Sequence, residues 1–113
     1  MPPRPVPSIV KTPAARAVWA KLVAGLRDVG VFETEEKKTS IHVVHGRAFV
    51  GVHPRATGLV LQIVTDAPIR SRRVTKVEQT SARRFHNTVK LEDAADVDRE
   101  LLGWIARAHA LTA

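Results

Sequence analysis

The sequence predicts an α+β fold, a five-stranded antiparallel sheet flanked on one face by N- and C-terminal helices. Two segments, one near each end of the chain, have apolar residues at steps of three and four, which is typical of amphipathic helices. Between them the apolar residues recur at every second position, which is typical of half-buried strands. With 113 residues, of which 44% are hydrophobic and 26% charged, the chain suits one globular domain.

The first predicted helix begins at Thr12-Pro13. Threonine is a good cap, and proline fits the first helical position because its missing N–H would have no partner there. The apolar stripe ends before Gly30, a natural helix stop. It consists of Ala15, Val18, Trp19, Leu22, Val23, Leu26 and Val29. Residues 1–11, "MPPRPVPSIVK", are predicted to be a proline-rich arm, and residues 12–113 to form the single domain.

Residues 39–52 predict a β-hairpin that turns at His45-Gly46, where glycine supplies the positive φ of a two-residue turn. In this register Val43 faces Ala48, and His42 faces Phe49. One side of the hairpin then collects Ile41, Val43, Ala48, Val50 and Val52, and the other collects Lys38, Ser40, His42, Phe49, Gly51 and His53. This segregation is what a half-buried antiparallel pair requires.

Three further strands complete the predicted sheet. The strand "GLVLQIVT", residues 58–65, adds Leu59, Leu61 and Ile63 to the apolar side, and Val60, Gln62 and Val64 to the polar side. The fourth strand is expected at 74–78 and the fifth at 85–91, with Val89 and Leu91 turned inward. The predicted order is therefore α-β5-α, with both helices on the apolar face.

The closing helix is predicted from a second apolar stripe and an acidic start. Asp93 is the expected cap, and Asp96, Asp98 and Glu100 suit the first turns, where the helix dipole favours negative charge. The stripe consists of Ala94, Val97, Leu101, Trp104, Ile105, Ala108 and Leu111. We interpret the acids as helix-start residues and not as metal ligands.

The histidines of "HVVHGRAFVGVHPR", residues 42–55, raise the question of a metal or catalytic site. A metal site needs ligands that converge, but no Asp or Glu lies between Glu36 and Asp66, and Lys38 sits beside the candidate position. A catalytic histidine needs a nucleophile and an orienting carboxylate, and only Ser40 is near. The sequence therefore predicts polar strand residues, with no catalytic residue, metal or cofactor.

Positive charge is concentrated between residues 67 and 85, in a chain whose formal net charge is +7. This segment has six cations and one acid, Glu78. The arginine guanidinium matches phosphate oxygens in geometry, so the segment favours nucleic acid or another phosphate-bearing ligand as partner. The predicted phosphate-binding residues are Arg70, Arg72, Arg73, Lys76, Arg83 and Arg84, together with Arg47 and Arg55.

The polar side of the sheet suggests an alternative function, because it mixes apolar with polar side chains. Such a surface suits a protein partner or a second copy of the chain. The predicted partner face consists of His42, Phe49, His53, Val60 and Gln62. Phe49 and Phe85 are the only rings expected to stack on bases, since aromatic residues make up only 4% of the chain. A small-molecule-binding domain or an enzyme of unknown type is the third alternative.

The remaining composition bears on location. The chain has no cysteine, which excludes disulfides and thiolate metal sites and fits a cytoplasmic protein. No stretch reaches the roughly 18 apolar residues of a membrane span, and the N-terminus lacks the apolar run of a signal peptide. We therefore expect no membrane association.

Three segments together resemble one known family. "VWAKLVAGLRDVG", "EKKTSIHVVHGRAFVGVHPRATGLVLQIV" and "DVDRELLGWIARAHA" are similar to the "domain of unknown function 5655" family over about residues 15 to 110. The resemblance implies a small α+β domain and a nucleic-acid-linked accessory role, but no defined activity. The α-β5-α order is also similar to that of frataxin-like iron chaperones. Those proteins rely on an acidic first helix, whereas here Asp28 is the only acid between residues 12 and 32.

Overall fold

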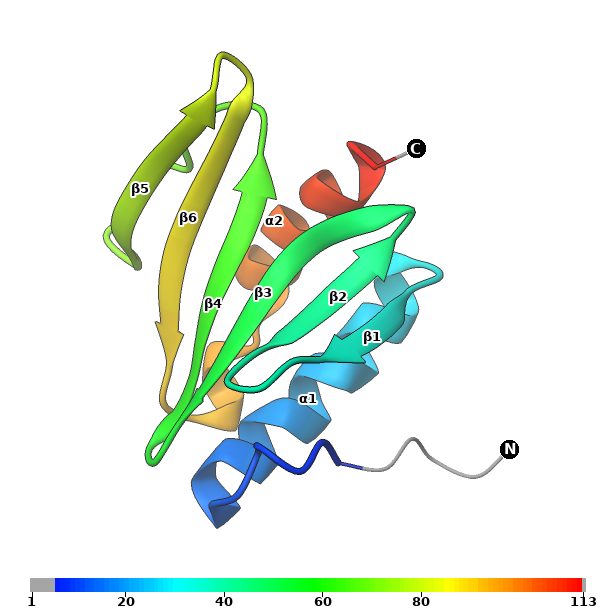
Figure 1. Cartoon of the computed structure of the whole chain (residues 1–113). Coiled ribbons are helices and arrows are strands. Elements are labelled where there is room, and N and C mark those ends of the chain that lie inside the picture. The colour runs from blue at the N-terminus through cyan, green and yellow to red at the C-terminus, as the bar shows by residue number, and fades with distance from the viewer. Residues whose placement is uncertain (1–5, 113) are drawn as a thin grey trace.

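The computed structural model describes residues 6–112 as two helices, a short 3-10 turn and an antiparallel sheet (Figure 1). The elements are α1 (Pro13–Val29), β1 (Glu33–Glu36), β2 (Ile41–His45), β3 (Arg47–Arg55), β4 (Gly58–Thr65), β5 (Val74–Ser81), β6 (Arg84–Leu91), the 3-10 turn η1 (Ala94–Asp96) and α2 (Arg99–Ala110). The strand order across the sheet is β1-β2-β3-β4-β6-β5. The predicted α+β class with an antiparallel sheet is confirmed.

Both helices pack against the same face of the sheet, and the opposite face, called the open face below, is bare (Figure 1). The core lies between the helices and the sheet. Its fully buried side chains include Leu22 and Leu26 of α1, Leu101 and Ile105 of α2, and Ile41, Val43, Leu59, Leu61, Ile63, Val89 and Leu91 of the strands. Most of the apolar stripe and inward strand positions expected from periodicity form this core. The inward placement of Ala48 is wrong, because Ala48 pairs with the half-buried Val44 and lies on the open face.

The prediction of five strands is wrong, because the sheet has six. The additional strand, β1, has the sequence "ETEE" and pairs antiparallel with β2 alone. Glutamate is uncommon in strands, and an edge strand this short has no apolar alternation to reveal it. Its pairing with an apolar neighbour, and not its own composition, makes it a strand.

The β2–β3 register also differs from the prediction. Val44 pairs with Ala48 but Val43 pairs with Val50, so Phe49 is an extra residue in a β-bulge. The placement of Phe49 on the polar side is wrong, because its side chain is 1% exposed and lies in the core. Beyond the bulge the observed pairing differs from the predicted pairing by two residues. Because side chains alternate between the two faces, a shift of two keeps each residue on its face, so Ile41, Val43, Val50 and Val52 are buried as predicted.

Side-chain caps define the helix ends. Thr12 caps α1 by accepting a hydrogen bond from the Ala15 N–H, as predicted. Asp93 caps the 3-10 turn and not α2, whose cap is Asp98, accepting from the Leu101 N–H at 2.9 Å. The acidic start predicted for one helix thus serves two successive turns.

The described part of the predicted N-terminal arm packs on the domain. Ser8 donates hydrogen bonds from its N–H and its hydroxyl to the Glu36 carboxylate, each at 2.8 Å. Val10 is buried in the core. Residues 1–5 of the arm lie outside the described residues.

Asn87 holds the segment that links β4 to β5 against the helix-side face of the sheet. Its side chain is fully buried and donates to the Ile63 carbonyl and the Thr65 hydroxyl, both at 2.8 Å. Its Oδ1 accepts from the Ile69 N–H at 2.9 Å, and Ile69 is itself buried. This network fixes the start of the arginine-rich segment on the same side of the sheet as the helices.

We predict that Leu61→Ala lowers the free energy of unfolding by about 2–5 kcal/mol, because it leaves a cavity between the helices and the sheet. Val60→Ala, one residue away on the open face, should cost less than about 1.5 kcal/mol, since Val60 is only half-buried. Urea unfolding followed by circular dichroism measures both. Equal losses from the two variants would contradict the assignment of faces.

Candidate nucleic-acid interface

The predicted arginine segment does not form one surface, because Arg73 is committed to α2. Its Nη1 donates to Asp98 Oδ1 at 2.9 Å and to Glu100 Oε1 at 3.2 Å, and its Nη2 donates to the Asp96 carbonyl at 2.6 Å. The guanidinium also lies over the Trp104 ring, 5.6 Å from the ring centre. Its hydrogen-bonding capacity is largely used within the protein, so Arg73 positions the helix start and is not available to a ligand.

Burial alone would lower the pKa of Arg73, but its hydrogen bonds to Asp98 and Glu100 outweigh burial and raise that pKa. For Asp98, the hydrogen bond from the Leu101 N–H is the main cause of a lowered pKa, and the Arg73 guanidinium contributes further. The pair is therefore charged on both sides throughout the neutral range.

The other predicted cations are dispersed. Arg70 and Arg72 are exposed on the segment between β4 and β5, and Lys76 is exposed on edge strand β5. Arg55 lies at the β3–β4 turn, where its Nη1 donates to the Pro54 carbonyl at 3.1 Å. Arg47, Arg83 and Arg84 are the three that the structure brings together.

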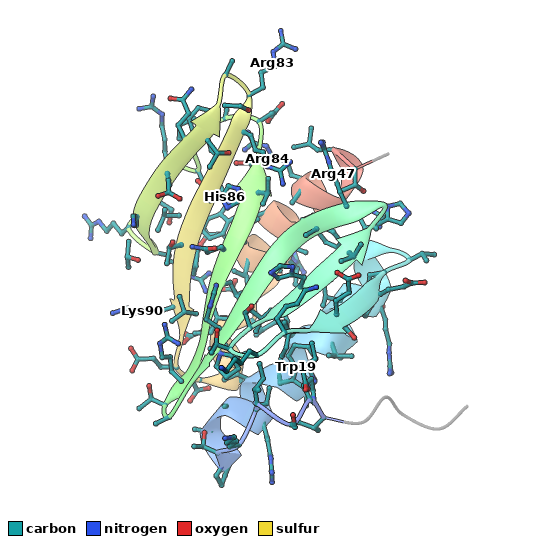
Figure 2. All side chains as sticks on the ribbon, viewed as in Figure 1. Trp19, Arg47, Arg83, Arg84, His86 and Lys90 are labelled. Atoms are coloured by element: carbon teal, nitrogen blue, oxygen red, sulfur yellow. The ribbon has the colours of Figure 1, made fainter. Side chains whose placement is uncertain are left out.

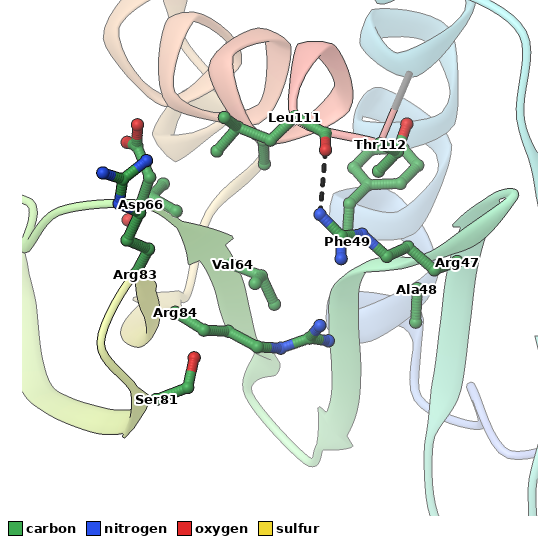
Figure 3. Close-up of a pocket in the computed structure, with 12 residues that line it drawn as sticks. Arg47, Ala48, Phe49, Val64, Asp66, Ser81, Arg83, Arg84, Leu111 and Thr112 are labelled. Carbon is green, nitrogen blue, oxygen red and sulfur yellow. Dashed lines mark hydrogen bonds between the residues drawn. The ribbon is translucent and has the colours of Figure 1, made fainter.

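These three arginines line a pocket of about 400 Å³, called the arginine pocket below (Figure 3). Arg47 comes from the start of β3, and Arg83 and Arg84 come from the β5–β6 turn and the start of β6. Ser81, Phe49 and Leu111 are among its other lining residues. The side chain of Arg84 extends across the pocket toward Ala48 (Figure 3). The pocket lies beside the C-terminal end of α2, about 18 Å along that helix from the Arg73 site at its start.

The end of α2 is held by the β2–β3 hairpin, which shapes one wall of the pocket. Arg47 Nη2 donates to the Leu111 carbonyl at 2.9 Å, and His45 Nδ1 lies 2.8 Å from the Thr112 hydroxyl oxygen. The rings of His45 and His109 stack with centres 4.3 Å apart, and Phe49 meets His109 edge-on at 5.3 Å. The β-bulge that turns Phe49 inward therefore positions the helix end.

The electrostatics of the arginine pocket are strongly positive. Its lining includes one carboxylate, Asp66, which already pairs with Arg107 at 3.1 Å. Among the described residues, Arg83 and Arg84 make neither an ion pair nor a side-chain hydrogen bond. Two guanidinium groups are thus free to receive an anion, which is the chemistry of a phosphate site.

A stripe of cationic and polar side chains continues from the pocket along β6. Arg84, His86, Thr88 and Lys90 occupy alternate positions, and the intervening Asn87, Val89 and Leu91 are buried on the helix side. Figure 2 shows Arg84, His86 and Lys90 following this strand on the open face. The prediction missed His86 and Lys90, although the same alternation in "RFHNTVKL" would have placed them on the polar side.

The predicted partner face is present without its aromatic residue. His42, His53, Val60 and Gln62 are half-buried and alternate with core residues, which places them on the open face. Phe49 is absent from it for the reason given above. Within residues 6–112, no three His, Asp or Glu side chains gather as metal ligands, and neither helix is long and apolar enough to cross a membrane.

Comparison with known families gives one match. The family model described as "Domain of unknown function (DUF5655)" matches residues 7–112. Searches among curated proteins and among solved structures give no significant match.

The Asp98–Arg73 pair gives a prediction about pH. Because the pKa of Asp98 is lowered on folding, its contribution to stability is present above its unfolded value near 3.8 and is lost as pH falls through the folded value. We expect Asp98→Asn to reduce the loss of stability between pH 5 and pH 2.5, since asparagine keeps the cap but cannot titrate. Thermal unfolding across this pH range measures the effect, with Asp28→Asn as a control for the change in net charge. If Asp98→Asn lost as much stability between pH 5 and pH 2.5 as wild type, the lowered pKa of Asp98 would not account for the acid sensitivity.

Proposed function

Because the chain belongs to the DUF5655 family, which is defined by sequence and not by an activity, we propose its function from the geometry: the domain binds nucleic acid. The observation that carries this proposal is the arginine pocket, in which Arg47, Arg83 and Arg84 converge and the one carboxylate is already paired. Phosphate oxygens are the natural ligands of unpaired guanidinium groups at a surface.

The β6 stripe favours an extended anion over a small one. A single phosphate would be satisfied by the arginine pocket, but Lys90 carries a further positive charge near the far end of β6, with the polar side chains of His86 and Thr88 between (Figure 2). Residues two apart in a strand are spaced by roughly 6.5 Å. A phosphodiester backbone laid along β6 would therefore meet a polar or cationic side chain at regular intervals.

The proposed binding surface includes only part of the arginine-rich segment 70–84. Arg83 and Arg84 stay in the proposed site, whereas Arg73 leaves it because of its contacts with α2. Arg70 and Arg72 contribute to the general positive field and not to the pocket. They would strengthen association at low salt without selecting the bound geometry.

We predict that Arg83→Ala/Arg84→Ala weakens binding to all oligonucleotides alike. On duplex DNA, log affinity should fall with log salt by about 0.9 for each phosphate contacted, and the double variant should flatten this slope by about two contacts. Fluorescence anisotropy between 50 and 200 mM salt provides the measurement. Lys21→Ala/Arg27→Ala, which removes the same charge from the exposed side of α1, is the matched control and should change the slope much less.

Arg70→Ala/Arg72→Ala separates the pocket from the segment. An effect as large as that of the pocket variant would mean that the binding surface follows the arginine segment. No binding of wild type at 50 mM salt would reject the proposal.

A second candidate function, protein interaction or self-association, is favoured by the bare face of the sheet. Val44, Val60 and Val64 are half-buried there, with no helix over them. Edge strand β5 is less suited to pairing with another strand, because two register irregularities interrupt it.

For self-association we predict that light scattering of wild type shows a dimer that Val60→Glu dissociates. Val60 is used because charging the buried Phe49 would disrupt the core instead. A monomer at all concentrations, unaltered by the substitution, would remove self-association through this face.

A further inference from the structure

A row of paired residues crosses the open face through a glycine. His42 of β2 pairs with Gly51 of β3, which pairs with Gln62 of β4, and the row continues to Thr88 of β6. Gly51 places no side chain between His42 and Gln62, whose Cα atoms lie roughly 9–10 Å apart across two strand spacings. A groove of about 190 Å³, called the Gly51 groove below, occupies this part of the open face.

The Gly51 groove is continuous with the arginine pocket. Ala48, Val64 and Arg84 line both. The Arg84 guanidinium therefore lies both at the edge of the Gly51 groove and in the arginine pocket. A ligand that carries both a ring and a phosphate would span the two.

The polar side chains at the groove have no partner within the described chain. His42, Gln62 and His86 are half-buried, and none makes an ion pair or a side-chain hydrogen bond with another described residue. The carboxamide of Gln62 has a donor and an acceptor in one plane, as a nucleobase edge requires. The imidazole of His42 supplies a flat face of the kind on which unpaired bases stack.

The backbone does not require glycine at position 51. Gly30 and Gly46 are the glycines with positive φ, so Gly51 has an ordinary strand conformation. A Cβ placed there would meet Gln62 and the His53 ring at 3.8–3.9 Å, which is normal van der Waals contact. Glycine in a strand interior costs about 0.5–1 kcal/mol relative to alanine, so its presence marks a place where something approaches the backbone closely.

We propose that the Gly51 groove binds one base of a single-stranded nucleic acid, stacked on the imidazole of His42 and hydrogen-bonded at its edge by the carboxamide of Gln62. Arg84 holds the adjacent phosphate. This inference rests on the proposed function and adds strand type and base contact to it. The groove is smaller than the roughly 300 Å³ at which ordinary ligand sites begin, so it admits a ring and not a base pair. In a duplex the bases are stacked and paired and cannot enter.

The test compares three labelled probes at 50 mM salt: a single-stranded 12-mer, an abasic 12-mer of equal charge, and a duplex. Wild type should bind the single strand about tenfold more tightly than the abasic probe, which lacks the stacking contact. Gly51→Val should bind both equally while its melting temperature stays at or above that of wild type. Gly103→Ala, whose added methyl group meets nothing within 4 Å, is the control and should behave as wild type.

A second pair of variants keeps the test informative if Gly51→Val folds poorly. His42→Phe should retain the preference for intact over abasic single strands, because the ring still stacks, and His42→Ala should lose it. If wild type bound the intact and abasic probes equally, the proposed base contact would be wrong, but phosphate binding at the arginine pocket would still be supported. Failure to bind any probe would overturn both proposals.

Discussion

The structure depends on one constraint, that both helices cover the same face of the sheet. Each central strand must then alternate, with Ile41, Leu61 and Val89 sealed under the helices and their neighbours left on the open face. Helices on both faces would have required apolar residues on both sides of these strands. The polar character of the open face follows from this one-sided packing. Its cations Arg84 and Lys90 lie on β6, and Glu33, Glu35 and Glu78 lie on the two edge strands.

The convergence of the arginine pocket follows from topology and from one local irregularity. Antiparallel pairing brings the start of β3, the end of β4 and the β5–β6 turn to the same end of the sheet, beside the end of α2 (Figure 1). The bulge at Phe49 packs that ring against His109, and Arg47 binds the Leu111 carbonyl. These contacts, together with the Arg107–Asp66 ion pair, hold the end of α2 beside the arginines.

The sequence predicts well whatever is repeated along one element. The stripe of α1, the Thr12 cap and the inward positions of β4 all follow from periodicity and capping chemistry, because each is set by neighbours a few residues away. The buried positions Ile41, Val43, Val50 and Val52 of the β2–β3 hairpin were also predictable, whereas the sides of Ala48 and Phe49, next to the bulge, were not. The bulge and the displaced turn together shift the register by an even number of residues.

Features set by distant residues could not be predicted. Strand β1 forms because the apolar strand β2 pairs with it. Phe49 lies on the buried face and not on the predicted polar face, because of a β-bulge that the alternation of apolar residues does not indicate. Arg73 lies in a run of equivalent cations, yet its partners Asp98 and Glu100 lie 25 and 27 positions away. Only the tertiary structure separates this structural arginine from Arg83 and Arg84, whose side chains form no ion pair or hydrogen bond with the other residues of 6–112.

The central claim is that the open face and its arginine end form the binding surface, and backbone amide chemical shifts test it directly. Titration of ¹⁵N-labelled protein with a short single-stranded oligonucleotide at low salt should shift amides of β3, β4 and β6 most, including those of Gly51 and Arg84. Amides of α1 should stay in place. Shifts confined to residues 70–73 or to the helices, or no shifts at all, would contradict the account.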